Sequence, residues 1–417
     1  MEKYLILNLH LFDNTNVTTD NELSVEMKTY YADFLIDNAV PKLVHDQFGQ
    51  KVPIPQGKGK TVEFRKYTPL VKALTPLTEG VTPEGKKLNV TSLEATVQQY
   101  GDYIEVSDML ILTAIDNNLV QATKLLGNQA GETLDTITRE VLNGGTNVQY
   151  GESSVTARYQ LSGGLDTGNH YLSVKGINMG VRTLKVQKAE KIDGYYIVIA
   201  HPDTLFDLME DKRWIHAAEY AGSEQIFEGE VGKLSGCRFV ETTEAKIWHA
   251  DDLVKADGTN GAVRNLTIAS VAGAVVTVKE AIAQAQADDM VGRMVIIGNE
   301  LNKIESVTAG AAGAAKVTLE AAPSATAADT VIYPGEAGAE GRDVYSTLMI
   351  GDNAYGVTEI QGGGLQHIVK QLGSSGTADP LNQRATVGWK ATKTAERLVE
   401  QFILRIETAS TFESGAN

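Results

Sequence analysis

The sequence has 417 residues, of which 42% are hydrophobic and 22% are charged, and its formal net charge is −16. This composition is typical of a folded chain with two or three domains, and it excludes low-complexity disorder for most of the chain. The negative charge argues against a dedicated nucleic-acid-binding groove, which usually has a basic face. It permits a protein that encloses nucleic acid without binding it tightly.

The N-terminal residues and the single cysteine give no sign of export. Residues 1–12 carry Glu2, Asn8 and His10 within or beside a short apolar run, and no small-residue cleavage site follows, so we expect a non-secretory start. No run approaches the ~20 apolar residues that a membrane-spanning helix needs. Cys237 cannot form an intrachain disulfide, which suits a reducing cytoplasm, and we expect it to be a small core side chain.

Residues 1–22 are polar after the short apolar run and predict a terminal arm that is ordered only when it is bound to something. Ser24 is a suitable N-cap for a helix, and apolar residues recur at helical spacing through 25–40. Pro53 and Pro55 then interrupt the chain.

Residues 58–145 predict a long arm rather than a pocket. Two strands are predicted at 61–68 and 90–106, with a tip rich in proline and glycine between them at 75–85. A helix of roughly eight turns follows at 116–145. An isolated two-stranded hairpin is marginally stable in water. Because nothing nearby in the sequence can cover this arm, we expect another subunit to cover it.

The next segment predicts a mixed α/β domain. Residues 174–188 have the spacing of an amphipathic helix, and 195–200 are dense in β-branched and aromatic residues, which predicts a buried strand. Asp203 or Thr204 is expected to cap a helix that runs to Met209. A short strand, a turn at Gly236 and a second strand are expected within 229–240.

The composition changes at about Asp251, after which the chain is rich in alanine, glycine, valine and threonine up to about Arg342. A weak internal repeat relates three segments to three later ones: 268–271, 276–278 and 287–291 resemble 304–307, 317–319 and 328–331. This pattern predicts a small all-β module inserted into the preceding domain, on its surface. Beyond the module the composition again resembles that of the preceding domain, with strands expected at 345–350 and 354–360 and a long closing strand at 397–406.

The sequence contains no recognisable catalytic or cofactor motif. It lacks a P-loop, a G-x-G-x-x-G turn and an H-E-x-x-H pair, and one cysteine excludes a zinc ribbon. The aspartates of residues 251–258 resemble part of a calcium-binding loop. Leu253 and Lys255 stand where oxygen ligands are needed, so we do not predict a calcium site there. We therefore expect no catalytic residue, no metal and no cofactor.

A set of short motifs together resembles the major capsid proteins of tailed bacteriophages, with the N4-like podovirus branch as the nearest match. The motifs are YY at 30–31, LVHDQFG at 43–49, GKTVEFRKY at 59–67, LTEGVTP at 77–83, YGDY at 100–103, TLD at 133–135, GDNAYG at 351–356, DPLN at 379–382 and GWK at 388–390. The resemblance covers roughly 24–250 and 342–410, so it leaves out the inserted module.

The resemblance implies an α+β chain with the Hong Kong 97-type capsid fold and an inserted small all-β domain. The implied segments are an N-terminal arm (1–57), an extended β-hairpin loop (58–106), a peripheral domain with a spine helix (107–194), the first part of an axial domain (195–250), the inserted domain (251–341), and the axial remainder with a return strand of the peripheral domain (342–417).

The implied function is structural, not enzymatic. Subunits of this family form hexamers and pentamers of an icosahedral shell that encloses double-stranded DNA without sequence-specific binding, assembled in the host bacterial cytoplasm and found in the virion. Scaffold, portal and decoration proteins are the implied further partners, and no membrane is involved. The candidates for intersubunit contact lie at the hairpin tip: Thr78, Glu79, Gly80, Thr82 and Pro83.

Two other classes stay open. An encapsulin-type compartment would use the same fold to hold cargo protein, although the inserted module and the motif set argue against it. A surface adhesin or glycan-binding protein would use the β module, although that module has Tyr333 as its one aromatic residue, which makes sugar stacking improbable. Some shells of this fold also crosslink through Lys and Asn side chains, and the sequence leaves that question open.

Overall fold

The computed structural model describes residues 43–55, 57–67, 70, 72–74, 76, 79, 82, 85–109, 118–162, 170–214, 233–298, 300–360, 364–372, 374 and 381–412. The helix expected at 25–40 and most of the expected N-terminal arm lie outside these residues. The chain divides into two compact units, which are described separately. Unit 1 comprises Met1–Gln47, Lys51–Ile137 and Val357–Ala395, and unit 2 comprises Phe48–Gln50, Thr138–Gly356 and Glu396–Asn417.

Unit 1 contains the expected hairpin, but its second strand is shorter than predicted. Strand β2 (Thr61–Tyr67) pairs antiparallel with β3 (Val90–Thr96), and β4 (Gln98–Ser107) then enters a different sheet. The prediction of one strand over 90–106 is therefore wrong. The break between β3 and β4 is visible as a change of phase: the more buried side chains lie at odd positions in β3, such as Ala95, and at even positions in β4, such as Val106. A change of phase in a period of two marks a break between strands.

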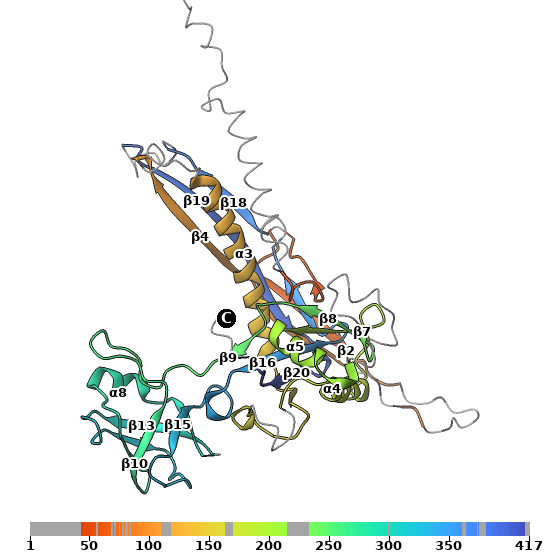
Figure 1. Cartoon of the computed structure of the whole chain (residues 1–417). Helices are drawn as coiled ribbons and strands as arrows, with labels where there is room; N and C mark the ends of the chain where they lie inside the picture. The colour runs from red at the N-terminus through yellow and green to blue at the C-terminus, as the bar shows by residue number, and fades with distance from the viewer. Residues whose placement is uncertain are drawn as a thin grey trace, which may run out of the picture. The chain divides into compact units, whose positions relative to one another are not determined.

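Strand β19 (Arg384–Arg397) is the centre of the second sheet of unit 1. It pairs with β4 over ten residues, from Arg384 opposite Ser107 to Lys393 opposite Gln98, and with β18 (Gln366–Lys370) on part of its length. The sheet continues through β17 (Tyr355–Thr358) and β1 (Gln50–Lys51). Helix α3 (Asn118–Asn143) lies along β4 and β19 in Figure 1.

The core between α3 and this sheet is made within the chain. Leu126, Ala130 and Leu134 of α3 pack with Val387, Trp389 and Ala391 of β19. The expectation that another subunit covers the arm is thus wrong for β4 and α3. The expectation is wrong because the covering strand, β19, lies about 280 residues later in the sequence and was not predicted as a strand.

Two of the motifs that carried the family resemblance face each other in this sheet. Gly101 lies opposite Lys390, and Tyr103 lies opposite Gly388. A β-carbon on Gly101 would stand 2.5 Å from the Trp389 carbonyl oxygen, and one on Gly388 would stand 2.8 Å from the Asp102 carbonyl oxygen. The two glycines therefore allow these strands to approach closely.

Unit 2 is built around a seven-stranded mixed sheet in the order β5-β20-β16-β6-β8-β7, with β9 pairing β16. Its strands are β5 (Val148–Tyr150), β6 (Tyr196–Ala200), β7 (Lys233–Leu234), β8 (Cys237–Glu241), β9 (Ile247–Trp248), β16 (Val344–Ile350) and β20 (Ile403–Thr408). Helices α4 (Val174–Val186) and α5 (Pro202–Met209) contribute Ile177, Leu184 and Leu205 to the same core as Val198 and Met349. The strands predicted at 195–200 and 345–350 and the helix at 174–188 are confirmed, within a residue or two at their ends.

Two details of the prediction for unit 2 are wrong. Helix α5 is capped by His201, whose Nδ1 accepts a hydrogen bond from the Asp203 N–H at 3.2 Å, rather than by Asp203 or Thr204. The expected single strand over 397–406 is two strands, because a 3-10 turn (Glu400–Phe402) separates the end of β19 from β20.

The insertion is a closed six-stranded barrel in the order β10-β11-β14-β13-β12-β15. Its elements are β10 (Leu266–Ala272), β11 (Val275–Val278), α8 (Gln284–Met290), β12 (Met294–Ile297), β13 (Glu300–Thr308), β14 (Lys316–Leu319) and β15 (Val331–Pro334). The first two segments of the predicted repeat are confirmed as equivalent strand pairs, β10–β11 and β13–β14. The third differs, since 287–291 falls largely in α8 whereas 328–331 is a turn leading into β15. A barrel needs no further partner for its edges, which explains how this module is added without disturbing the sheets around it.

Cys237 is fully buried in the core of unit 2, as the sequence predicted. Burial raises the pKa of its thiol to about 12, from an ordinary value of 9.0. Since the thiolate is the reactive form, we expect no labelling of the native protein by a maleimide at pH 8 and full labelling in urea. The thiol also contributes stability that is complete below about pH 9 and is lost as the pH rises towards 12, because the unfolded thiol ionises first. Labelling of the native protein at the rate of a free thiol would contradict this account.

Candidate functional site

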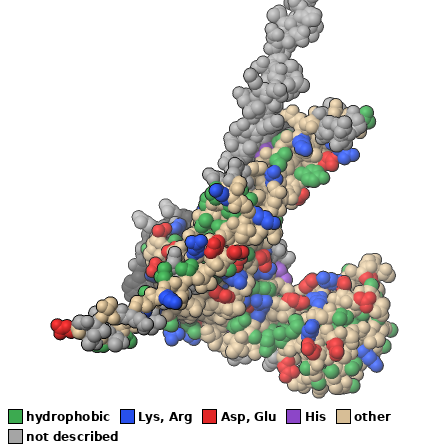
Figure 2. Space-filling view, turned by 180° about the vertical axis from the view of Figure 1, so that it is seen from behind, with side chains coloured by type: hydrophobic (Ala, Val, Ile, Leu, Met, Phe, Trp, Pro, Cys, Tyr) green, Lys and Arg blue, Asp and Glu red, His purple; other side chains and the backbone are tan. Residues whose placement is uncertain are grey.

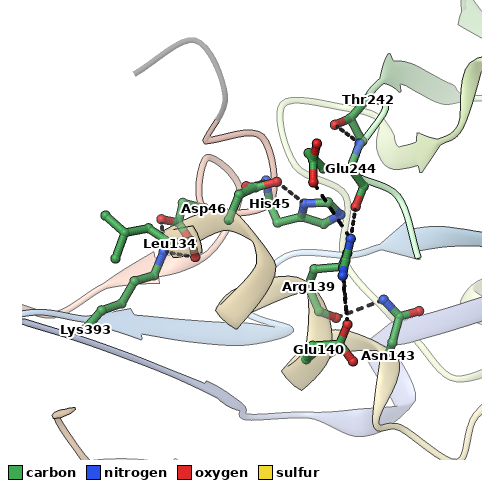
Figure 3. A network of polar contacts seen from close by, with 10 residues as sticks. His45, Asp46, Leu134, Arg139, Glu140, Asn143, Thr242, Glu244 and Lys393 are labelled. Carbon is green, nitrogen blue, oxygen red and sulfur yellow. Dashed lines mark hydrogen bonds and ion pairs between the residues drawn. The ribbon is translucent and has the colours of Figure 1, made fainter. Parts of the chain in front are cut away.

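A buried polar network in unit 1 joins the residues before the hairpin to the middle of α3. His45 donates its backbone N–H to Asp135 Oδ1 at 2.7 Å, and its Nδ1 lies 2.6 Å from Asp135 Oδ2. Lys393 of β19 donates to the Leu134 carbonyl oxygen at 2.7 Å and forms an ion pair with Asp46. Figure 3 shows Lys393, Asp46 and His45 gathered around the α3 backbone. The network therefore fastens 45–46, α3 and β19 to one another.

Lys393 is the ionised centre of this network. Its side chain is 6% exposed, and burial lowers the pKa of its ammonium group, while the nearby Asp46 carboxylate acts in the opposite direction. An ion pair so far from water stabilises little by itself, but removal of one member leaves a buried unpaired charge. The arrangement is therefore suited to fixing geometry.

A cavity of 460 Å³ lies beside Lys393 within unit 1. Its walls are mostly apolar and include Leu43, Leu134, Val357 and Leu365. A catalytic pocket of this size usually joins apolar walls to convergent acid, base or nucleophile groups. Of the charged groups in its walls, Asp46 and Lys393 are engaged with each other, and Lys51 and Glu359 are exposed to solvent. The walls therefore do not present a convergent set of buried charged groups.

In unit 2, the last turns of α3 form a second network. Arg139 donates from Nη1 to the Glu244 carbonyl oxygen at 2.9 Å and from Nη2 to Glu140 Oε1 at 3.0 Å. Asn143 donates from Nδ2 to the Arg139 carbonyl oxygen at 2.8 Å, as Figure 3 shows. These contacts hold the end of α3 against the loop that carries Glu244.

The most deeply buried charge of unit 2 is Glu407 of β20, whose side chain has no solvent exposure. Its two carboxylate oxygens accept from Arg158 Nε and Nη2 at 2.7 and 2.8 Å, and Oε1 also accepts from Arg405 Nε at 2.7 Å. The Arg158 guanidinium stacks 3.7 Å above the Trp248 ring centroid, and Arg405 further donates to the Asn143 and Gly145 carbonyl oxygens. Burial lowers the pKa of Arg405, while Glu407 acts in the opposite direction. This cluster joins four separate segments of unit 2.

The hairpin tip holds the predicted contact residues. Thr78, Gly80 and Pro83 lie outside the described residues, and Glu79 and Thr82 are exposed. The sequence reading missed four apolar side chains that flank the tip and face solvent, at exposed fractions of 62, 82, 65 and 46% for Leu70, Leu74, Leu88 and Val90. Their signal was visible as large apolar residues within a tip otherwise rich in proline, glycine and charge. Apolar side chains exposed together on one segment indicate an interaction surface.

The described residues contain no group of three or more His, Cys, Asp or Glu side chains placed to hold a metal ion. In the part of the chain that the structure covers, no helix is both long and apolar enough to span a membrane. On the face shown in Figure 2, acidic and basic side chains are interspersed rather than gathered into one large basic field. The prominent features of both units are thus structural networks and exposed apolar segments.

The sequence and the fold of this chain are similar to those of known proteins. Residues 90–240 match the sequence family described as phage capsid protein. The structure is similar to the capsid of Ralstonia phage GP4, with a TM-score of 0.51 and 13% identity over 88% of both chains. It is also similar to the capsid of Cyanophage P-SCSP1u, with a TM-score of 0.50 and 9% identity over 87% of both chains. No curated protein matches the chain.

The fold is therefore the Hong Kong 97-type fold of phage capsids, and the α+β fold predicted from the sequence is confirmed. Over residues 90–240 the chain matches the phage capsid protein family, as the motif set indicated. Its placement in the N4-like branch and its division into six segments stay predictions.

Proposed function

We propose that copies of this chain assemble into hexamers and pentamers of an icosahedral shell that encloses double-stranded DNA. Assembly takes place in the host bacterial cytoplasm, with scaffold and portal proteins as partners and decoration proteins as further candidates. The enclosed DNA is held without sequence-specific contacts. The protein has no enzymatic role in this proposal.

The observation that carries the proposal is the hairpin of unit 1. Strands β2 and β3 form a two-stranded sheet of their own, and Leu70, Leu74 and Leu88 are exposed beyond it. A two-stranded sheet with an exposed apolar end gains little stability in water, and it gains much more when a neighbour covers it. Burying one apolar patch in a different surface of the next copy is a heterologous contact, which builds rings and lattices. Thr78, Glu79, Gly80, Thr82 and Pro83 are proposed to belong to this contact.

The hairpin can be tested without disturbing the rest of unit 1. A chain in which 68–89 is replaced by a short Gly-Ser turn keeps β2, β3 and the core between α3 and β19. We expect the wild-type chain, expressed with its scaffold, to sediment as particles, and the shortened chain to remain as monomers or small oligomers with unchanged circular dichroism. Particle formation by the shortened chain at the wild-type level would contradict the role assigned to the hairpin.

A further inference from the structure

The C-terminal end of α4 carries a group of cations that the net charge conceals. Arg182 and Lys185 are exposed on α4 and line a hollow of 480 Å³ together with Asn178 and Ser235. Lys191 lies at the same place, because its Nζ would stand 2.8 Å from a β-carbon on Gly236, in the β7–β8 turn. Lys185 and Lys191 both act electrostatically on Cys237, which confirms that they lie close to one point of the fold. Lys188 follows directly after the helix and is also exposed.

We call Arg182, Lys185, Lys188 and Lys191 the α4 basic cluster. None of these four side chains forms an ion pair among the described residues, whereas Lys175 at the other end of the helix is paired with Glu152 at 2.7 Å. The carboxylates of the same segment, Glu190 and Asp193, are exposed and form no ion pair with the cluster. The cluster is therefore free to meet an external anion.

The helix dipole accounts for only part of this cluster. Cations within the last turn of a helix are stabilised by the carbonyl groups there, which suits Lys185. Arg182 begins a turn earlier, and Lys191 lies beyond the helix against the β7–β8 turn. A dipole contribution does not account for Lys191 at the β7–β8 turn, where Ser235 lines the same hollow as Arg182 and Lys185.

Four acidic residues line a hollow at the opposite end of α4; Glu210 is exposed, and the other three are already engaged within the chain. Glu152 binds Lys175 and Ser173, Asp207 accepts from Ser410 and Thr411, and Asp211 accepts from the Val174 N–H at 3.0 Å. A second copy therefore offers no free acidic cluster there as the counterpart. A polyanion with regularly spaced charges fits four unpaired cations better than scattered carboxylates do.

We propose that the α4 basic cluster binds the phosphate backbone of double-stranded DNA. The proposal rests on the proposed function and adds the residues that contact the enclosed DNA in a chain whose net charge is −16. Long flexible cations on an open surface contact phosphates without reading bases. The contact is thus local and independent of sequence, and it tethers the DNA weakly to the shell.

The salt dependence of DNA binding tests this assignment. The probe is a short fluorescein-labelled duplex of random sequence, and anisotropy is measured with the unassembled full-length chain across a salt series. Each phosphate neutralised contributes about −0.9 to the slope of log K against log salt, so four contacts predict a slope of about −3 to −4. Removal of two contacts in the variant Arg182→Gln with Lys185→Gln should make the slope less steep by about 2.

The matched control removes two exposed lysines of the barrel, Lys303→Gln with Lys316→Gln, and changes the net charge equally. It should leave the slope unchanged. The proposal is overturned if the wild-type chain fails to bind the duplex at low salt, or if the α4 variant keeps the wild-type slope. Loss of particle assembly in the α4 variant with an unchanged slope would instead assign the cluster to contact with a second copy. Failure of the wild-type chain to form particles, which sedimentation measures separately, would speak against the proposed function alone.

Discussion

Replacing Glu407 with glutamine is expected to destabilise unit 2 by about 3–5 kcal/mol. The change keeps the shape of the side chain but removes the negative charge that pairs with both Arg158 and Arg405. The Glu407 side chain has no solvent exposure, so water cannot replace the lost carboxylate charge beside the two guanidinium groups. Breaking a buried pair costs far more than the pair contributes, because the remaining charge stays desolvated. The measurement is urea denaturation followed by circular dichroism at 222 nm, an ordinary far-ultraviolet helix signal.

The matched control is Glu140→Gln. Glu140 also pairs with two cations, Arg139 and Lys246, but its side chain is 46% exposed, so the loss should be below about 1 kcal/mol. Equal losses at the two positions would show that burial does not determine the effect, and the account of the Glu407 cluster would fail. A Glu407 variant that is as stable as the wild type would contradict the account directly.

Replacing Lys393 with methionine is expected to destabilise the contact between α3 and β19 by about 3–5 kcal/mol. Methionine keeps the length of the side chain but removes the ammonium group that pairs with the Asp46 carboxylate, which is 15% exposed. It also removes the hydrogen bond to the Leu134 carbonyl oxygen. Amide hydrogen exchange along α3 and β19 measures the effect locally, so a separate unfolding of the barrel does not disturb it.

A double variant separates the charge from the packing. Lys393→Met with Asp46→Leu should recover most of the lost protection, because both charges of the pair are then absent. Lys279→Met is the control, since Lys279 and Asp329 form a pair whose side chains are 48% and 75% exposed, and its effect should be small. If the double variant is less protected than Lys393→Met alone, the ion pair is not the source of the stabilisation.

The sequence predicted those parts of the fold in which local pattern and tertiary packing agree. Strand β6 is buried at all five positions and was readable from its β-branched density, and α4 was readable from its apolar stripe. The long strand β19 was missed because its 14 residues mix buried and polar positions with Gly388 and Lys393. Its alternation shows clearly only once β4 and α3 are known to lie against it.

The functional surfaces were predicted less completely, for a physical reason. Thr78, Glu79 and Gly80 were predicted as intersubunit contacts because they lie at the hairpin tip. The leucines beside them are visible in the sequence as large apolar residues, but only the structure shows that nothing in the described chain covers them. The α4 basic cluster was hidden as well. Lys191 and Arg182 are nine positions apart, and only the structure shows that Lys191 lies beside Gly236 and that Arg182 lines a hollow with Ser235, both in the β7–β8 turn.

The central claim is that this chain builds a closed shell, and cryo-electron microscopy of particles from the chain expressed with its scaffold tests it most directly. The account predicts icosahedral particles whose subunits show the α3–β19 core, with the β2–β3 hairpin and Leu70, Leu74 and Leu88 buried against a neighbouring copy. A chain that stays monomeric with its scaffold, or particles in which these leucines remain exposed to solvent, would contradict it.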